Sequence, residues 1–234
     1  MSSGELRGVL TTCITLGLAV GVFAISFGVA AVAAGATVAQ TCVMSLLVFT
    51  GASQFSAVSV VRDGGSVGSA LGGALLLAAR NAVFGLTMSP RIKGRLGIRL
   101  VAAQLTIDES TAMATAQADP RLQRLAFWTT GASIYVFWNV GTLIGALVGD
   151  SIDPTTFGLD AALPAAFVAM LFPHLRTRRG RRAALIGAGL CAVTIPILPI
   201  GVPILCASLG ILVGLPPDPD DADAGVEHEA GLPA

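Results

Sequence analysis

The chain has 234 residues, of which 54% are hydrophobic and only 12% are charged, and its mean hydropathy is +0.80. Soluble domains are about a quarter charged, so this composition indicates a polytopic integral membrane protein and excludes a large soluble core. The net charge is zero, which removes the electrostatic argument for nucleic-acid binding. The four cysteines all fall within apolar runs and share no metal-ligand spacing, so neither a metal nor another cofactor is expected.

Apolar runs recur along the chain, and a helix needs about 20 apolar residues to cross a bilayer. The sequence therefore predicts an all-α membrane protein with about seven transmembrane segments. They are expected at residues 9–34, 41–61, 67–89, 100–116, 125–149, 154–172 and 183–215. Residues 1–8 are expected to form a cytoplasmic N-terminus, residues 9–215 the transmembrane transporter domain, and residues 216–234 a disordered acidic tail.

Two of these runs differ from a simple crossing. Residues 100–116 contain Asp108, Glu109 and further polar side chains, so they either cross the membrane or enter it and return. Residues 183–215 would extend about 50 Å as one helix at 1.5 Å per residue, which is too long for one straight crossing. Prolines between positions 196 and 203 divide this run, so it forms either a broken helix or a short hairpin.

An internal similarity bears on the architecture. The hexapeptide TGASQF at residues 50–55 recurs as TGASIY at residues 130–135, which is 80 positions later. The same offset relates a first unit at about residues 9–89 to a second at about residues 100–172, with three crossings in each. An odd number of crossings inverts the second unit relative to the first, as in many secondary transporters. We therefore expect two inverted three-span repeats followed by the proline-broken C-terminal segment.

The distribution of Lys and Arg leaves two topologies open. With seven crossings and a cytoplasmic N-terminus, nine of these residues lie on the cytoplasmic side and four lie outside, which obeys the positive-inside rule. If residues 100–116 instead re-enter and the N-terminus lies outside, the split becomes eleven to two. The repeat favours seven crossings, although the basic loop at residues 91–99 then falls on the outside.

Three ionisable side chains interrupt the apolar runs: Arg80, Asp108 and Glu109. A charge at the bilayer centre costs about 2.5–3.5 kcal/mol, which favours a paired, functional residue. Arg80 and its neighbour Asn81 offer donors to a carboxylate, or Arg80 neutralises one of the acids as a structural pair. The two adjacent acids point in different directions on a helix, so one could pair with Arg80 while the other stays protonatable and couples transport to protons. The alternative is a polar cluster near the interface.

Two further segments are candidate walls of a binding site. Ser53 and Gln54 offer hydrogen bonds in the middle of residues 41–61, where they serve either a ligand or helix packing. At Phe27 and Gly28 the first span either breaks, which would expose N–H groups to a carboxylate, or continues, because transmembrane helices tolerate glycine.

Several stretches together resemble the family of AzlC-type branched-chain amino acid exporters (permeases). The stretches are LVFTGASQF at residues 47–55, ARNAVFGL at residues 79–86, SPR at residues 89–91 and TIDES at residues 106–110. The resemblance covers about residues 10–215, and the Gly-Ala-Ser-Gln-Phe block is its most specific part.

The resemblance implies secondary active export of branched-chain or similar apolar amino acids across the bacterial inner (plasma) membrane. It also implies a separately encoded small membrane subunit of the AzlD type, and energy from protons or the membrane potential. The alternative is a non-transporting membrane scaffold or channel subunit, and an enzyme is not expected because neither histidine lies mid-span. The residues expected at the site are, for substrate, Phe27, Gly28, Ser53, Gln54, Arg80 and Asn81, and, for proton coupling, Asp108 and Glu109.

Overall fold

A computed structural model of the chain describes residues 3–149, 168 and 171–214, and all of the regular secondary structure in these ranges is helical. The chain divides into two compact units, Met1–Ala165 and Ala166–Ala234, and each is described by itself. The expected acidic tail at residues 216–234 lies outside the described residues, as does most of the expected crossing at residues 154–172.

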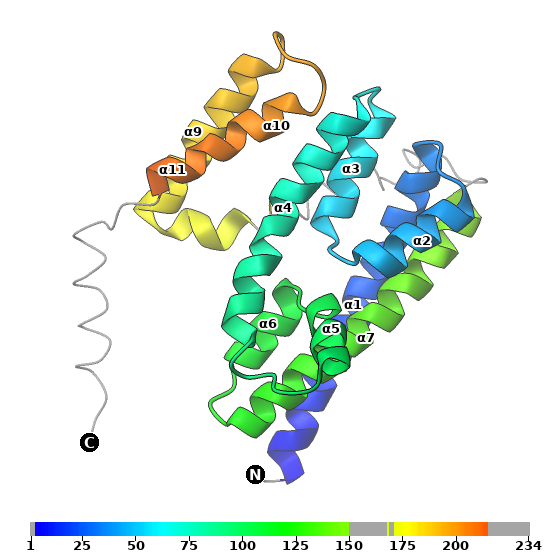
Figure 1. Cartoon of the computed structure of the whole chain (residues 1–234), viewed down its shortest axis with the longest axis vertical. Helices are drawn as coiled ribbons and strands as arrows, with labels where there is room; N and C mark the ends of the chain where they lie inside the picture. Colours follow the sequence, from blue (N-terminus) through cyan, green and yellow to red (C-terminus); the bar gives the residue numbers. More distant parts are fainter. Residues whose placement is uncertain (1–2, 150–167, 169–170, 215–234) are drawn as a thin grey trace. The chain divides into compact units, whose positions relative to one another are not determined.

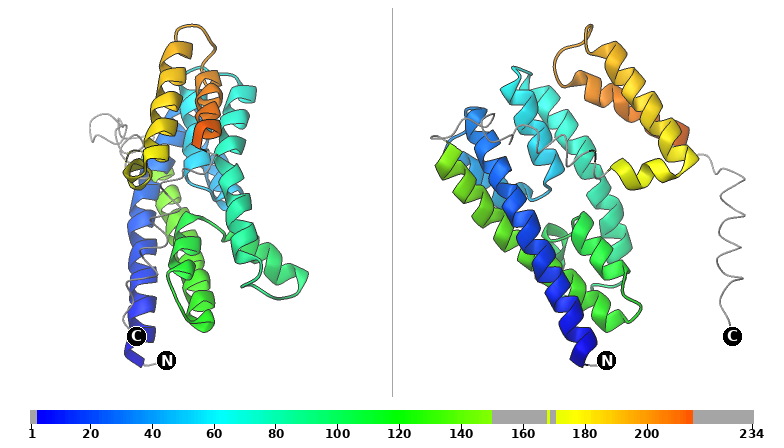
Figure 2. Two further views of the ribbon diagram at one scale, coloured as in Figure 1. Left: turned by 90° about the vertical axis from the view of Figure 1, so that its left-hand side faces the viewer. Right: turned by 180° about the vertical axis from the view of Figure 1, so that it is seen from behind.

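Three helices of the first unit are long and apolar enough to cross a membrane: α1 (Ser3–Ala33), α4 (Val67–Met88) and α7 (Pro120–Gly149). α1 and α7 run side by side in the same direction, and α4 runs in the opposite direction (Figures 1 and 2). The expectation of an all-α membrane protein is therefore confirmed. Seven crossings are not confirmed, because these three helices are the candidate spans among the described residues.

Small residues let α1 and α7 approach closely along their parallel seam. A Cβ atom added to Gly21 would collide with Phe137, and one added to Gly28 would overlap backbone atoms of α7. On the facing helix, a Cβ atom on Gly145 would overlap the carbonyl of Ile25. Such close backbone approach is typical of transmembrane helix pairs. Because α1 is continuous through Gly28, the alternative of a break in the first span is wrong, and this glycine serves packing.

The second apolar run forms a helical hairpin. α2 (Val38–Val48) and α3 (Ala52–Arg62) make a V, and α3 returns to the end of the unit at which α2 began (Figures 1 and 2). Each arm has 11 residues, or about 16 Å at 1.5 Å per residue, roughly half of a bilayer core. The predicted single crossing at residues 41–61 is therefore corrected: the structure has a hairpin of two short helices there, and the chain reverses between them.

Side chains hold the tip of the first hairpin together. Gly51 has a φ of +57°, which favours glycine, and its N–H donates to Oε1 of Gln54 (3.1 Å). The Nε2 group of Gln54 donates to the carbonyl of Met44 (3.3 Å), so one buried amide connects α3 to α2. Phe49 also has a positive φ, of +24°, and its ring packs edge-on against Tyr135 with centroids 4.9 Å apart.

A second hairpin enters from the opposite end of the unit. α5 (Leu96–Gln104) rises from the end at which α4 finishes, and α6 (Asp108–Thr115) returns to that end (Figures 1 and 2). With only 9 and 8 residues, neither helix is long enough to span a bilayer. Of the two alternatives for residues 100–116, the structure has the one in which the chain reverses.

The two hairpins share one capping arrangement at their tips. The N–H of Ile107 donates to Oγ of Ser110 (3.1 Å), just as the N–H of Gly51 donates to the side chain of Gln54 (3.1 Å). The residues of the second cap follow those of the first by 56 positions. Each hairpin also follows a long helix and precedes the next one, so the order of elements recurs along the chain.

The expected 80-residue register of a repeat is not confirmed. Residues 50–55 lie at the tip of the first hairpin, whereas residues 130–135 lie inside the continuous helix α7. Residues 25–28 lie inside α1, whereas residues 105–108, at the same offset, form the tip of the second hairpin. The sequence similarity at this offset therefore joins segments of different structure.

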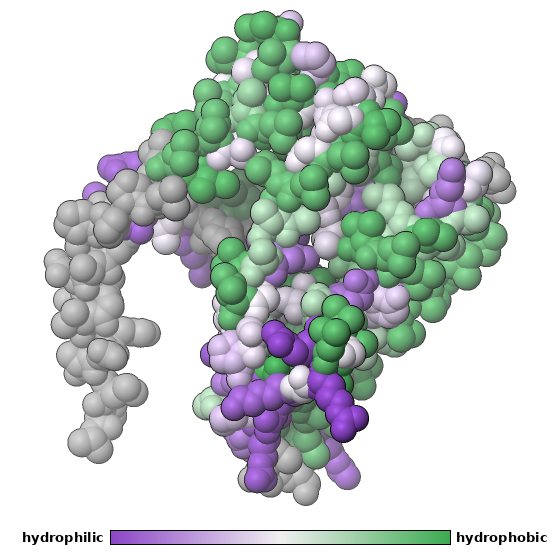
Figure 3. Space-filling model, viewed as in Figure 1, coloured by the Kyte–Doolittle hydropathy of each residue, from purple (hydrophilic) through white to green (hydrophobic). Residues whose placement is uncertain are grey.

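The hairpins gather the basic residues at one end of the first unit. The N-terminus and the connections after α4 and α6 share that end (Figure 1), and the space-filling view shows a hydrophilic surface there beside an apolar band (Figure 3). The basic loop at residues 91–99 thus lies on the same side as the N-terminus, as the positive-inside rule requires. Among residues 3–149 the other end carries Arg62 alone, against Arg7, Arg91, Lys93, Arg95, Arg99, Arg121 and Arg124 at the basic end.

The second unit is a smaller helical hairpin. Its described helices are η2 (Phe172–Arg176), α9 (Arg178–Thr194), α10 (Val202–Ala207), η3 (Ser208–Gly210) and α11 (Ile211–Gly214). α10 and α11 pack back against α9, and the chain reverses between Thr194 and Gly201, whose φ is +90°. Of the two forms expected for residues 183–215, a broken helix or a hairpin, the structure has the hairpin.

Candidate functional site

The described residues hold one ion pair within the apolar part of the first unit. The Nη2 atom of Arg80, near the middle of α4, lies 2.7 Å from Oδ2 of Asp108, the first residue of α6. The two side chains are 28% and 32% exposed, so both charges are half-buried. A charge in such a place is stable only with a partner, and the structure identifies Asp108 as the acid that neutralises Arg80.

Arg80 keeps hydrogen-bonding capacity that the ion pair does not use. Its buried Nε–H has no partner among the described residues, and a guanidinium carries five N–H donors. The neighbouring Asn81 is partly exposed and makes no side-chain hydrogen bond in the described part of the chain. The middle of α4 therefore presents unused donors beside a neutralised charge.

Glu109 follows Asp108 in the first turn of α6 and forms no ion pair in the ranges that the structure describes. Two acids in this position are stabilised by the positive end of the helix dipole. The matching first turn of α3 carries no acid, because Ala52 and Ser53 occupy the corresponding positions. The site thus combines a cation with unused donors and an acid without a counter-ion, an arrangement that suits a zwitterion.

The first turn of α3 uses its polar groups inside the protein. Ser53 is 2% exposed and its hydroxyl contacts that of Thr50, while the side chain of Gln54 is fully buried in the cap of the first hairpin. The structure therefore places both residues in the frame of the tip. Phe27 is also fully buried, and it packs on Phe55 and Trp138 with ring centroids 5.4 and 6.1 Å away.

The two hairpins are joined by a side chain that sequence reasoning missed. The Nε2 group of Gln104, the last residue of α5, donates to the carbonyls of Leu46 (3.0 Å) and Leu47 (3.3 Å) at the end of α2. The hydroxyl of Tyr135 on α7 donates to the same Leu46 carbonyl (3.2 Å). These bonds satisfy carbonyls that a helix end leaves unpaired. The available signal was an amide within an apolar run, two residues before the polar segment that begins at Thr106.

Comparison with known proteins assigns the chain to a family. The model of the AzlC protein family matches residues 15–152, which is more than half of the chain. The chain belongs to the AzlC family. The matched range contains most of α1, all of α4 and α7, and both hairpins, so the family resemblance of the sequence is confirmed.

Relatives of this AzlC-family chain are membrane proteins of bacteria. It is 25% identical over 217 residues to "Branched-chain amino acid transport protein AzlC" of Bacillus subtilis (strain 168), covering 90% of this chain and 82% of that protein. It is 30% identical over 204 residues to "Inner membrane protein YgaZ" of Escherichia coli (strain K12), covering 81% and 82%. An "Uncharacterized membrane protein" of Helicobacter pylori (strain J99 / ATCC 700824) is 24% identical over 152 residues, covering 64% and 67%. No solved structure matches.

These findings fix the location of the protein. The relatives are named as membrane or inner membrane proteins, and the first unit holds three helices that are long and apolar enough to span a bilayer. The chain is therefore a multi-pass protein of the bacterial inner (plasma) membrane, as the sequence predicted.

Proposed function

We propose that this chain is the large subunit of a two-component secondary exporter, which moves branched-chain or similar apolar amino acids across the inner membrane. The name of the B. subtilis relative supports a role in branched-chain amino acid transport. The observation that carries the proposal is the ion pair of Arg80 and Asp108, held half-buried beside a hairpin tip, with Glu109 next to it.

In this proposal the substrate meets the pair as a zwitterion. The unused N–H groups of Arg80, with the amide of Asn81, would receive the carboxylate, because a guanidinium matches the two oxygens of that group. The ammonium group would approach Glu109. Three other expected residues would support the site without touching the substrate. Gly28 would allow the close packing of α1 and α7, and Ser53 and Gln54 would hold the tip of the first hairpin. Phe27 would belong to the apolar wall of the site.

We further propose that the hairpins belong to an inverted repeat whose register is 56 residues. The first unit of this repeat would contain α1, α2 and α3, and the second would contain α4, α5 and α6. The shared caps, the opposite directions of α1 and α4, and the entry of the hairpins from opposite ends all support this register. Inverted repeats with interrupted helices supply the two gates that alternating access needs.

Proton coupling would belong to Glu109. Asp108 forms an ion pair with Arg80. If Asp108 exchanged its proton during the transport cycle, this ion pair would have to break and form again in every cycle. Glu109 has no salt bridge among the described residues, so protonation and substrate binding could compete for it directly.

A small AzlD-type membrane protein would be the second subunit. α4, which carries Arg80, leaves Leu71, Leu75 and Leu86 from 56% to 75% exposed, so lipid or another apolar protein must cover this face in the membrane. A second subunit on this face would lie against the helix that bears the site.

Export can be tested in dipeptide-fed bacteria that lack their own exporters. Cells that express this chain with its small partner should lower their internal leucine, isoleucine and valine relative to vector controls, and a scan of all amino acids should show the preference. Expression of this chain alone should give little efflux. An unchanged internal pool of every amino acid would leave the scaffold or channel-subunit alternative.

A further inference from the structure

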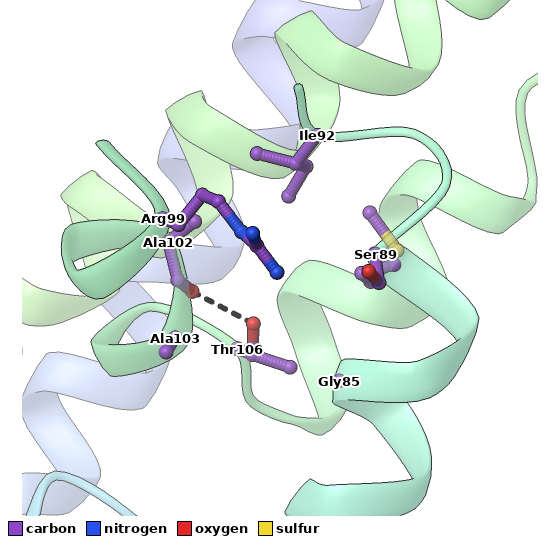
Figure 4. Close-up of a pocket in the computed structure, with 8 residues that line it drawn as sticks. Gly85, Ser89, Ile92, Arg99, Ala102, Ala103 and Thr106 are labelled. Carbon is purple, nitrogen blue, oxygen red and sulfur yellow. Dashed lines mark hydrogen bonds between the residues drawn. The ribbon is translucent and has the colours of Figure 1, made fainter. Parts of the chain in front are cut away.

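A pocket lies on the basic side of the proposed site, between the C-terminal part of α4, the connection after it, and α5. Its volume is about 160 Å³. The polar lining residues are Ser89, Arg99 and Thr106, and Met88, Ile92 and Ala102 form much of its apolar wall (Figure 4). None of these lining residues belongs to the ion pair of Arg80 and Asp108.

Arg99 gives the pocket an unneutralised positive charge. Its guanidinium points into the space between α5 and the end of α4 (Figure 4), and it makes no hydrogen bond or ion pair within residues 3–149. The lining contains no acid. A guanidinium without a protein acceptor, in a partly enclosed apolar pocket, is complementary to a carboxylate or a phosphate.

Of the two hydroxyl groups of the pocket, only one is free to donate to the same ligand. Oγ1 of Thr106 donates to the carbonyl of Ala102 (2.7 Å), which fixes its side chain at the rim of the second tip. The hydroxyl of Ser89 makes no hydrogen bond among the described residues and remains available as a donor. Beside these groups, Met88 is 1% exposed and Ile92 is 8% exposed, so their side chains form a packed apolar surface.

The position of the pocket connects it to the proposed site. Gly85 of its lining lies five residues after Arg80 on α4, about 7.5 Å along the helix at 1.5 Å per residue. On the opposite wall, Thr106 lies two residues before Asp108. The second tip therefore has the ion pair on one side and the pocket on the other.

We propose that this pocket is a second binding site on the transport path, which we call the outer site because it lies between the ion pair and the basic end of the unit. Arg99 holds the carboxylate of the amino acid there. A cavity of about 150 Å³ in another protein admits a molecule as large as benzene, so a carboxyl group and a short apolar side chain fit here. The pocket is open on one side, so the ammonium group can stay hydrated. The inference rests on the proposed function and adds a second substrate-binding site to it.

The first experiment measures occupancy directly. In a chain whose four native cysteines are replaced by alanine, the Ser89→Cys variant places a thiol in the pocket, and a water-soluble maleimide reports its accessibility. Leucine should slow the labelling at least threefold, and leucinamide, which lacks the carboxylate, should not. Adding Arg99→Gln should abolish the protection, whereas Arg95→Gln, which removes an exposed cation outside the pocket lining, should leave it intact.

The second experiment separates binding from the rest of the cycle. In vesicles loaded with leucine, Arg99→Gln should raise the half-saturating leucine concentration for counterflow about tenfold, with the maximal rate within twofold, because a lost charged hydrogen bond weakens affinity by about that factor. Arg80→Ala should abolish counterflow but preserve leucine protection of the introduced thiol. Protection that survives Arg99→Gln, or that is absent while counterflow is normal, overturns the outer site and leaves the proposed function standing.

An anionic lipid headgroup offers the same chemistry as a carboxylate, and the vesicle composition distinguishes the two sources. The effect of Arg99→Gln should be equal in phosphatidylcholine vesicles and in vesicles with added phosphatidylglycerol. An effect confined to the anionic vesicles would assign Arg99 to lipid and overturn the inference. Absence of counterflow for every amino acid in the unmodified chain with its partner would overturn the proposed function itself.

Discussion

Arg80 and Asp108 are 28 positions apart and lie on two helices, yet their side chains meet with Nη2 and Oδ2 only 2.7 Å apart. The contact joins the middle of a long helix to the first residue of a short helix that begins inside the apolar part of the fold. A helix that begins inside the apolar part of the fold can carry an acid there, because the N–H groups of its first turn stabilise negative charge. The pair therefore links the second hairpin to α4.

Removal of the Arg80 guanidinium should abolish efflux. Arg80→Ala leaves Asp108 half-buried without a counter-charge and removes the donors proposed for the carboxylate, so we expect at least a 100-fold loss of leucine efflux with the protein still inserted. Efflux from loaded vesicles, normalised to membrane content, measures this. Arg62→Ala is the matched control, because Arg62 pairs with its neighbour Asp63 at the exposed surface.

A double substitution separates the structural role of the pair from its role in binding. Arg80→Leu combined with Asp108→Leu removes both charges, and replacing a buried pair by apolar residues is often neutral for stability. We expect normal insertion and thermal stability but no efflux. If the double variant exported leucine at the normal rate, the ion pair would be a structural element only.

Glu109→Gln should uncouple transport from protons. In wild-type vesicles an inward proton gradient should increase leucine efflux, since protons would return as the amino acid leaves. The amide cannot release or bind that proton, so the variant should lose the response to the gradient. Its leucine exchange should need a higher leucine concentration, because the contact proposed for the ammonium group is weakened. Measurement of efflux at several imposed gradients tests this, with Glu5→Gln as a control near the N-terminus. A normal response in the Glu109→Gln variant would assign coupling elsewhere.

Gln104→Leu should weaken the contact between the hairpins. The substitution leaves the carbonyls of Leu46 and Leu47 without their amide donor, at a cost of about 1–3 kcal/mol. Tyr135→Phe removes one more donor to the Leu46 carbonyl. Thermal unfolding in detergent should show lower midpoints for both variants, with non-additive losses in the double variant, because both side chains serve one carbonyl. Additive losses would indicate that these bonds are independent.

Gly28→Leu should disrupt the seam between α1 and α7. Any side chain at this position overlaps the backbone of α7, so we expect loss of folded protein in the membrane. Gly8→Leu is the matched control on the same helix, where nothing lies within 4 Å of an added Cβ. The yield of monodisperse protein after extraction measures the difference. Equal yields of the two variants would contradict close packing at Gly28.

The sequence by itself determined the class of protein, its family and the charges that interact. An apolar composition with few charges indicates that the chain folds in a lipid bilayer, and it therefore predicts a membrane protein. The three charges within its apolar runs favour paired, functional residues, because an unpaired charge is costly there. For Arg80 the sequence left two roles open, binding of a substrate carboxylate or pairing with Asp108 or Glu109, and the structure shows the pair with Asp108. The proline-rich interruption after Thr194 was also visible, because proline and glycine break helices locally.

Only the tertiary structure decided where the chain crosses and where it turns back. Residues 41–61 are as apolar as a full crossing, and hydropathy measures how many apolar residues follow one another but not the direction in which they run. The reversal depends on Gln54, Gln104 and Tyr135, which supply hydrogen bonds from three different helices to an interrupted backbone. Gln104 and Tyr135 are distant in sequence from the carbonyls that they bond, so no local pattern could reveal these contacts of the hairpin.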